Sequence, residues 1–194
     1  MGFQVLEIVF ALDRWLFRAV NAGHQNVVFD VLMPFLSIKR YLLVPGIAVG
    51  VLVWCRGGAR GRGAVLAAVL AIALADAGST WIKTLFARPR PCHALAGVHL
   101  LAGCTRSFAF PSSHAANTFA LAAALTYHSP RHAWPLWILA AAVSYSRLYL
   151  GVHYAGDAAG GAVLGVAAAA LALGATQAAQ AAWKRRRGRS TVSA

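Results

Sequence analysis

Three short segments of the chain combine cationic, hydroxyl and imidazole side chains in a pattern that suits phosphate chemistry. The first lies at the end of a long apolar stretch and contains Lys83, Arg88 and Arg90, with Pro89 and Pro91 ending the preceding helix. Two or three fixed cations at one point suit a multiply charged anion, because arginine binds through a planar fork and lysine as a point charge. The alternative is that Lys83 and Arg88 only reach from a helix end to an interface with water.

The second segment, residues 111–114 with the sequence PSSH, opens the next apolar stretch. Ser112, Ser113 and the unpaired backbone N–H groups of a first helical turn form an anion site, since the positive end of the helix dipole points at it. His114 in that turn can donate or accept a proton near neutral pH. A serine N-cap beside an unrelated histidine is the alternative, so this segment by itself is weak support for a site.

The third segment contains Ser146, Arg147, His153 and Asp157. His153 and Asp157 stand four residues apart, so the carboxylate can bond one imidazole nitrogen and leave the other free as a nucleophile. Arg147 adds a further cation that can bind phosphate. A purely structural hydrogen bond between His153 and Asp157 is the alternative.

The elements that must position these segments are apolar helices. The 194 residues are 59% hydrophobic, far above the ~45–50% usual for soluble domains. Since a helix needs ~17–25 residues to cross a membrane, we predict an all-α fold, a polytopic membrane helical bundle of about five or six transmembrane helices. The apolar stretches fall at residues 41–55, 64–86, 114–127, 133–150 and 158–183.

The charges between these stretches predict the orientation of the bundle. The chain has 18 Lys plus Arg against five acidic residues, a formal net charge of +13. Because the cations lie mainly between apolar stretches, they indicate membrane topology rather than nucleic-acid binding. The basic loop 56–62, Arg131 and the tail 184–194 fall on one side, which we assign to the cytoplasm. Loops 87–113 and 151–157 then face the outside, and the three segments lie in or beside these loops.

The first forty residues are expected to form interfacial and short helices. Five residues at helical spacing, with apolar residues on the remaining faces, predict an amphipathic helix in the interface. The stretch 26–37 is too short to span and contains Asp30 and Pro34, which predicts a tilted or partly inserted helix. The topology of residues 1–40 stays open. The five residues at helical spacing are Glu7, Ala11, Arg14, Arg18 and Asn21.

We predict a single domain over residues 1–194. Its parts are N-terminal interfacial and short helices over 1–40, a transmembrane core over 41–183 and a basic cytoplasmic tail over 184–194. Within the core, Asp76 precedes Lys83 by seven residues and shares its helix face. We expect Asp76 to fix Lys83 or a neighbouring helix through polar contacts.

Taken together, the three segments resemble the type 2 phosphatidic acid phosphatase superfamily, which includes glucose-6-phosphatase and the vanadium haloperoxidases. The family signature reads Lys, six residues, Arg-Pro; then Pro-Ser-Gly-His; then Ser-Arg, five residues, His, three residues, Asp. The chain follows that order and spacing across residues 83–157 and departs from it at Ser113, where the family usually has glycine. The matching residues are Lys83, Arg90, Pro91, Pro111, Ser112, His114, Ser146, Arg147, His153 and Asp157.

The resemblance implies a metal-independent phosphatase that works through a phosphohistidine. His153 would attack phosphorus with Asp157 orienting it, and His114 would protonate the leaving oxygen and later activate water. No cofactor or metal is implied, and Asp157 is the only carboxylate of the outer loops, too few for a two-metal site. The residues implied to hold the phosphate oxygens are Lys83, Arg90, Ser112, Ser113 and Arg147.

The resemblance also implies a lipid phosphate or lipid diphosphate as substrate, and the charge distribution predicts its hydrolysis at the extracytoplasmic face. The short chain and the N-terminal sequences DRWLFRAVN and FDVLMPFLS look similar to small bacterial undecaprenyl diphosphate phosphatases. That similarity implies the bacterial cytoplasmic membrane, with the site facing the periplasm. Phosphatidylglycerophosphate, phosphatidate, lipid A phosphates and sugar phosphates are alternative substrates, and an inactive scaffold or a transporter is the non-enzyme alternative. Membrane lipids are the expected surroundings, nucleic acid is not an expected partner, and the oligomeric state is open.

Cys92 and Cys104 share the predicted outer loop, and we hypothesise a disulfide between them, because the space outside the cytoplasm permits such bonds. Two free thiols are the alternative. Cys55 is expected near the cytoplasmic end of its helix and reduced. Four further histidines have no acidic neighbour in the sequence and are expected at the interface rather than in the site. They are His93, His99, His128 and His132.

Overall fold

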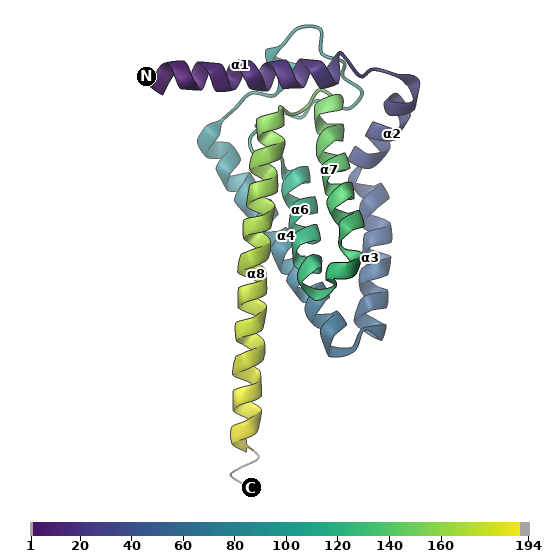
Figure 1. Ribbon diagram of the computed structural model, residues 1–194, viewed down its shortest axis with the longest axis vertical. Helices are drawn as coiled ribbons and strands as arrows, with labels where there is room; N and C mark the ends of the chain where they lie inside the picture. Colours follow the sequence, from purple (N-terminus) through teal and green to yellow (C-terminus); the bar gives the residue numbers. More distant parts are fainter. Residues whose placement is uncertain (1, 191–194) are drawn as a thin grey trace.

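The computed structural model describes residues 2–190, and over that range the chain is helical with no strand (Figure 1). The predicted all-α class is therefore confirmed. The elements in chain order are α1 (Gly2–Asn21), α2 (Val27–Ser37), α3 (Lys39–Arg56), α4 (Gly58–Phe86), α5 (Pro91–Ala94), α6 (Ser113–His128), the 3-10 turn η1 (Pro130–His132), α7 (Trp134–Tyr149) and α8 (Ala155–Ser190).

The core of the bundle lies between α4, α6 and α8, where buried alanines from all three helices form one cluster. Glycines bring α8 still closer to α6. A Cβ atom at Gly161 would collide with the carbonyl oxygen of Ser112, and one at Gly165 with the carbonyl oxygen of Ala116. Small residues let helices associate in lipid, where no hydrophobic effect drives them together. This close approach seats the first turn of α8 beside the first turn of α6.

Several of these helices have the length and composition of membrane spans. The stretches Gly58–Ala94 and Ala155–Arg185 are each long and apolar enough to cross a membrane. Helices α2 and α3 meet at a bend of 54°, and counting this bent pair as one span brings the number to three. Helices α6 and α7 have 16 residues each, which is short for a span. The predicted apolar stretches therefore all form helices, while the count of five or six spans stays a prediction.

Helix α1 lies across the end of the bundle, whereas the other long helices run along it (Figure 1). Its buried face carries Asp13, Phe17 and Asn21, spaced four residues apart. Apart from Phe17, many large apolar side chains of α1 are exposed, and Leu12 and Trp15 are 54% and 63% exposed. Helix α1 thus contacts the bundle mainly through two polar residues and one aromatic ring.

The N-terminal segment is fastened to the rest of the protein by hydrogen bonds from Asn21 and Asp30. The Asn21 side chain donates to the carbonyl oxygens of His99 and Tyr149, at 2.9 and 2.7 Å, and accepts from the backbone N–H of His99. Asp30 accepts hydrogen bonds from His99 Nε2, at 2.9 Å, and from the Tyr149 hydroxyl. Sequence spacing offers His99 no acidic neighbour, but the fold supplies Asp30 from α2. The end of α7 and the loop after α5 are held together by these contacts.

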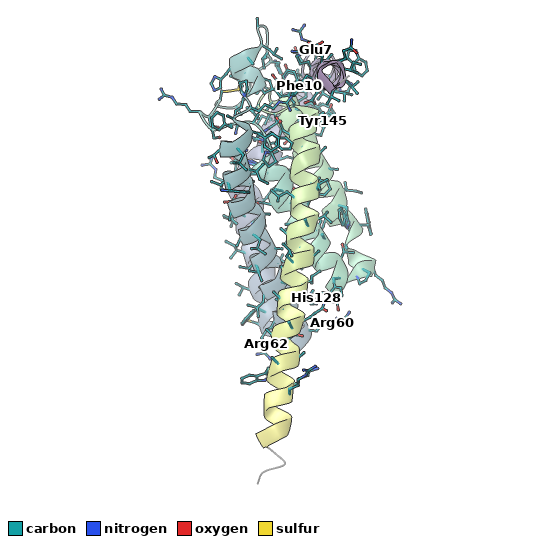
Figure 2. All side chains as sticks on the ribbon, turned by 90° about the vertical axis from the view of Figure 1, so that its left-hand side faces the viewer. Glu7, Phe10, Arg60, Arg62, His128 and Tyr145 are labelled. Atoms are coloured by element: carbon teal, nitrogen blue, oxygen red, sulfur yellow. A yellow bond between two sulfur atoms is a disulfide. The ribbon has the colours of Figure 1, made fainter. Side chains whose placement is uncertain are left out.

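Two polar ends lie on opposite sides of the apolar bundle. Figure 2 places Glu7, Phe10 and Tyr145 at one end and Arg60, Arg62 and His128 towards the other. At the second end, Arg60 Nη2 donates a hydrogen bond of 2.8 Å to the carbonyl oxygen of His128, which joins the start of α4 to the end of α6.

Candidate active site

The three segments singled out in the sequence converge at the end of the bundle that α1 covers. Each comes from a different helix end, so the bundle must form before they can meet. Lys83 lies near the end of α4, Arg90 precedes α5, Ser112 caps α6, Arg147 lies in the last turn of α7, His153 lies in the α7–α8 turn and Asp157 in the first turn of α8.

A tight turn after α7 carries His153. Gly151 adopts a φ of +76°, which non-glycine residues rarely adopt, and Val98 and His99 leave no room there for a Cβ atom. The backbone N–H groups of Val152 and His153 donate to the carbonyl oxygen of Arg147, so the chain folds back onto the helix end. The turn therefore buries the imidazole, which is 1% exposed.

The two imidazole nitrogens of His153 face different partners. Nδ1 lies 3.4 Å from Asp157 Oδ2, and Nε2 lies 3.2 Å from Arg90 Nη1. Burial lowers the pKa of His153 well below its ordinary value, and the nearby charges of Arg90 and Arg147 lower it further. The ring is therefore neutral near pH 7. With its proton on Nδ1 towards Asp157, the ring has its unprotonated nitrogen at Nε2, which accepts a hydrogen bond from Arg90 Nη1.

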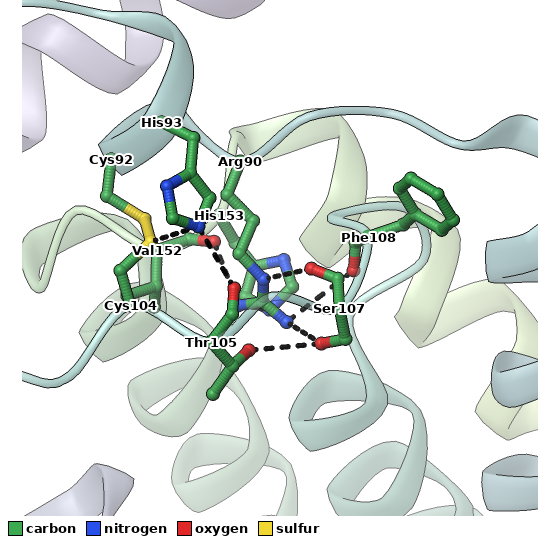
Figure 3. The surroundings of a disulfide bond; sticks show 9 residues. All are labelled: Arg90, Cys92, His93, Cys104, Thr105, Ser107, Phe108, Val152 and His153. Atoms are coloured by element: carbon green, nitrogen blue, oxygen red, sulfur yellow. Dashed lines mark hydrogen bonds between the residues drawn. A yellow bond between two sulfur atoms is a disulfide. The ribbon is translucent and has the colours of Figure 1, made fainter.

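Arg90 is held by the loop that precedes α6 (Figure 3). Its Nε donates 2.7 Å to the Ser107 carbonyl oxygen, and its Nη2 donates 2.9 Å to the Ser107 hydroxyl. The structure joins Cys92 and Cys104 by a disulfide with a Cα–Cα distance of 6.3 Å, so Arg90 and Ser107 lie just outside the closed loop. Ser107 belongs to no motif, and sequence reasoning missed it.

The Lys83 ammonium contacts backbone carbonyl groups of the residues that precede α6. It donates to the carbonyl oxygens of Phe108, at 3.1 Å, Ala109, at 3.4 Å, and Pro111. This contact ties the end of α4 to the loop that delivers Ser112. A fixed positive charge therefore lies beside the first turn of α6.

Residues 112–114 lie at the start of α6, where the sequence predicts an anion site. The Ser112 side chain caps the helix at the Ala115 N–H, and the Ser112 N–H donates 2.9 Å to the Asp157 carbonyl oxygen. The Ser113 hydroxyl lies 2.8 Å from the hydroxyl of Ser79, a buried residue of α4. The extra hydroxyl at the family's glycine position thus has a partner on α4, and no local sequence pattern indicates this contact.

The junction of α2 and α3 also enters the cluster. Arg147 Nη1 donates a hydrogen bond to the hydroxyl of Ser37, the buried last residue of α2. The His114 side chain hydrogen-bonds the backbone of the same residue. Ser37 therefore contacts both Arg147, which is predicted to bind phosphate, and His114, which is predicted to protonate the leaving oxygen. No motif marks Ser37, because its position depends on the bend between two helices.

The three segments of this cluster lie within a stretch of the chain that matches a known protein family. Residues 64–181, which include all three segments, match the PAP2 superfamily. The chain belongs to the PAP2 superfamily. The resemblance drawn from the three motifs is thereby confirmed, and the chain is a phosphatase of this family and an integral membrane protein.

Individual PAP2 proteins are similar over most of the chain. It is 28% identical to the undecaprenyl-diphosphatase BcrC of Bacillus subtilis, over 78% of this chain and 77% of that protein. It is 27% identical to the lipid A 4'-phosphatase of Porphyromonas gingivalis, over 83% of this chain and 71% of that protein. The crystal structure of Aquifex aeolicus LpxE superposes with a TM-score of 0.73 at 28% identity, covering 84% of this chain and 94% of that chain.

Arg88 and Asp13 are two residues whose roles the PAP2 motifs do not indicate. The sequence groups Arg88 with the phosphate-binding cations, but in the structure it donates to two carboxylates, Asp157 at 2.8 Å and Asp13 at 2.6 Å. Asp157 is therefore not the only carboxylate at this end of the bundle, since α1 contributes Asp13 and α2 contributes Asp30. Only the packing of α1 and α2 reveals this, because both lie far from Asp157 in the sequence.

Among the described residues, one group of side chains has the spacing of a metal site. Cys92, His93 and Cys104 lie together, but both sulfur atoms belong to the disulfide, which leaves His93 as the remaining ligand. In the candidate active site both Asp13 and Asp157 are bonded to Arg88. These residues do not favour a resident metal ion, because a divalent cation needs several free oxygen or nitrogen ligands.

Deeper in the bundle, Asp76 contacts a neighbouring helix rather than Lys83. Its carboxylate accepts a hydrogen bond of 3.0 Å from the Asn117 side chain of α6. This agrees with one of the two roles expected for Asp76 from its position in an apolar helix.

Proposed function

We propose that this PAP2 phosphatase hydrolyses a lipid diphosphate, with undecaprenyl diphosphate as the leading substrate, through a phosphohistidine on His153. The observation that carries the proposal is the geometry of that imidazole. Its Nδ1 faces Asp157 while its Nε2 faces the guanidinium of Arg90, so the free electron pair points at a cation that suits a phosphate oxygen.

The proposed reaction has two steps at phosphorus. First, a bond forms between His153 Nε2 and phosphorus as the bond from phosphorus to the leaving oxygen breaks, and His114 gives that oxygen a proton. A water molecule then attacks phosphorus, His114 takes its proton, and the bond to Nε2 breaks. Inorganic phosphate and the lipid monophosphate, whose phosphate carries the leaving oxygen, are the products.

Fixed positive charge supplies most of the proposed rate enhancement. Lys83, Arg90 and Arg147, with the N–H group of Ser113 in the first turn of α6, hold the three equatorial oxygens, over which the charge is spread in the transition state. Arg147 supports this assignment, because its Nε is buried and has no hydrogen-bond partner within residues 2–190. A buried donor of this kind suits an incoming phosphate oxygen.

The proposed orientation sets the site at the outer face of the membrane. The exposed apolar side chains of α1, including Ile8, Leu12 and Trp15, suit a helix that lies in the outer interface. The bent pair α2–α3 and helices α4, α6, α7 and α8 then cross the bilayer, and the basic residues beyond Trp183 remain in the cytoplasm. In a bacterial cytoplasmic membrane this orientation brings the cluster to the periplasmic headgroups, where the phosphates of lipid substrates lie.

Two substrate classes have specific support. The relative BcrC is an undecaprenyl-diphosphatase, and the N-terminal sequence of this chain is similar to such enzymes. A lipid A 4'-phosphate is the second candidate, because the Porphyromonas gingivalis relative is a lipid A 4'-phosphatase.

The deciding experiment measures phosphate release by the purified protein from a panel of substrates in excess EDTA. The panel contains undecaprenyl diphosphate and monophosphate, lipid A, phosphatidate, phosphatidylglycerophosphate and glucose 6-phosphate. We expect the highest kcat/KM with undecaprenyl diphosphate and full activity in EDTA. Highest activity on lipid A would favour the second candidate, and a preference for glucose 6-phosphate would refute a lipid substrate. Activity lost in EDTA and restored by magnesium would refute the metal-free mechanism.

A further inference from the structure

The N-terminal helix reaches the proposed catalytic pair through a single guanidinium. Arg88 Nη1 donates 2.8 Å to Asp157 Oδ1, and Arg88 Nη2 donates 2.6 Å to Asp13 Oδ2. The Asp157 side chain is fully buried and the Asp13 side chain is 9% exposed. One arginine therefore bridges α1 to the first turn of α8, away from solvent that would weaken the ion pairs.

Asp13 fits closely against the residue that precedes Asp157. Its second oxygen, Oδ1, accepts a hydrogen bond of 2.7 Å from the Gly156 N–H. A Cβ atom at Gly156 would lie 2.9 Å from Asp13 Oδ2, so a larger residue would push the carboxylate away. Both oxygens of Asp13 are thus committed, one to α8 and one to Arg88.

Aromatic rings fix the plane of the Arg88 guanidinium. Its central carbon lies 4.1 Å from the ring centroid of Tyr154 and 5.5 Å from that of Phe10, which α1 contributes. A cation near a ring face is attracted by the ring quadrupole. The two rings and two carboxylates leave the guanidinium a single orientation.

The short bonds on Asp157 are the ones that set its position. Asp157 Oδ2 accepts 2.8 Å from the Tyr154 N–H, and Oδ1 accepts 2.8 Å from Arg88, whereas His153 Nδ1 lies 3.4 Å away. The placement of the carboxylate against the imidazole therefore depends on Arg88. Without Asp13, the guanidinium would lose one of its two anchors and act on Asp157 with its full, unbalanced charge.

We propose that Asp13 is a positioning residue, which holds Arg88 in its bridging place and offsets its charge so that Asp157 stays aligned with His153. The inference rests on the proposed role of His153 as the nucleophile. Helix α1 is then a part of the active site. Its position against the bundle affects the rate of the chemical step.

The test compares Asp13→Asn with Asp30→Asn in the full-length protein acting on undecaprenyl diphosphate. Both changes neutralise a carboxylate of the N-terminal segment, but Asp30 bonds His99 and Tyr149, outside the catalytic cluster. We expect Asp13→Asn to lower kcat about tenfold with KM changed less than about twofold, as loss of one charge-assisted contact at the catalytic pair predicts. Asp30→Asn should leave kcat within about twofold of wild type. An unchanged kcat in Asp13→Asn, or an equal fall in both variants, would overturn the proposal.

A double-mutant cycle with Arg88→Gln separates positioning from a general loss of structure. Because Asp13 acts through Arg88, adding Asp13→Asn to Arg88→Gln should lower kcat no further. A double variant whose loss of kcat equals the product of the two single losses would contradict the proposal. If Asp13→Asn does not fold, Arg88→Lys takes its place, since lysine keeps the charge but lacks the two-pronged fork. Unchanged kcat in that variant would also overturn the idea. Wild-type turnover and its loss in His153→Ala, measured in the same assay, separate failure of this inference from failure of the proposed function.

Discussion

Lys83, Arg90 and Arg147 each donate hydrogen bonds to groups of the protein at the site. Their charges are therefore held in place before a substrate binds, and little reorganisation is needed when charge develops on the phosphoryl oxygens. His153 differs from these cations, because burial and its cationic neighbours keep it neutral. At the scale of single residues, the site combines fixed positive charge with one uncharged imidazole, the proposed nucleophile.

Removing either proposed catalytic histidine should stop turnover. His153→Ala removes the atom that bonds phosphorus, and His114→Ala removes the proton donor, so we expect kcat to fall by at least about 10²–10⁴-fold. Asp157→Asn should lower kcat less than either histidine variant, because the His153 imidazole itself remains. Phosphate release and trapping of a phosphoenzyme with radiolabelled substrate measure both effects, with circular dichroism as the control for folding. Near-normal phosphate release by His153→Ala would exclude the covalent mechanism.

The lowered pKa of His153 predicts the acid side of the pH profile. The nucleophile is active when neutral, and its pKa in the folded protein lies below its ordinary value. We therefore expect kcat/KM to decrease on the acid side only when the pH falls below ~6.5, the ordinary histidine pKa. By linkage, the unfolded chain takes up this proton first, so stability should fall as pH drops from ~6.5 towards the folded pKa. A half-maximal loss of kcat/KM at or above that pH would contradict the prediction.

At the scale of elements, the contact between α6 and α8 sets the position of the first turn of α6, the proposed anion site, relative to Asp157. The Ser112 N–H donates to the Asp157 carbonyl oxygen, and Gly161 lies against the Ser112 carbonyl one turn further on. The two helix starts are therefore held by backbone contacts, which side-chain motion cannot loosen. Helix packing and site geometry depend on the same small residues.

Replacing Gly161 or Gly165 with alanine should destabilise the protein. The added Cβ would meet a backbone carbonyl of α6, and backbone cannot move aside cheaply, so we expect a loss of about 1–3 kcal/mol. Gly174→Ala is the matched control, because it lies on the same helix and a Cβ there has nothing within 4 Å. Thermal unfolding in detergent measures the difference. A similar melting temperature for all three variants would show that α6 and α8 pack less closely.

The loop between α5 and α6 should depend on the bond between Cys92 and Cys104. Closing a loop of this size is worth ~3 kcal/mol in the chain-entropy model. We expect Cys92→Ser with Cys104→Ser to lower the unfolding temperature and raise KM, because Arg90 and Ser107 flank the closed loop. Cys55→Ser, at an exposed free cysteine, should change neither. Free thiols at positions 92 and 104, found by non-reducing mass spectrometry of protein isolated without reductant, would rule the bond out.

At the scale of the whole molecule, the apolar bundle separates a catalytic end from a basic end. The catalytic end carries α1 and the loops between helices, and the opposite end carries Arg60 and His128 (Figure 2). Positive residues stay on the cytoplasmic side of a membrane more often than they cross it. This separation of charge is the physical basis of the proposed orientation.

Fusion proteins test that orientation. Green fluorescent protein fused after residue 194 should fluoresce, and alkaline phosphatase fused there should be inactive, because the basic residues 184–189 hold that end in the cytoplasm. Alkaline phosphatase fused after residue 100, in the outer loop, should be active. The reverse pattern would place the catalytic cluster in the cytoplasm and contradict the periplasmic site.

Local sequence was enough to predict the helices and the three motifs, because their physical causes act over a few residues. Long apolar stretches predict helices in lipid, and the four-residue spacing of His153 and Asp157 allows their contact. Pro89 and Pro91 end α4 beside Arg90 through steric effects within the motif itself. The PAP2 resemblance followed from these motifs, since their order and spacing are properties of the chain.

Contacts between distant elements were decided only by the tertiary structure. The pairing of Asp13 with Arg88 joins residues 75 positions apart, and that of Ser37 with Arg147 joins residues 110 apart. Nothing in the local pattern distinguishes Asp13 from an exposed acidic residue of an amphipathic helix. Its burial depends on how α1 lies across the ends of α7 and α8, and that placement follows from packing of whole helices, which no short stretch of sequence specifies.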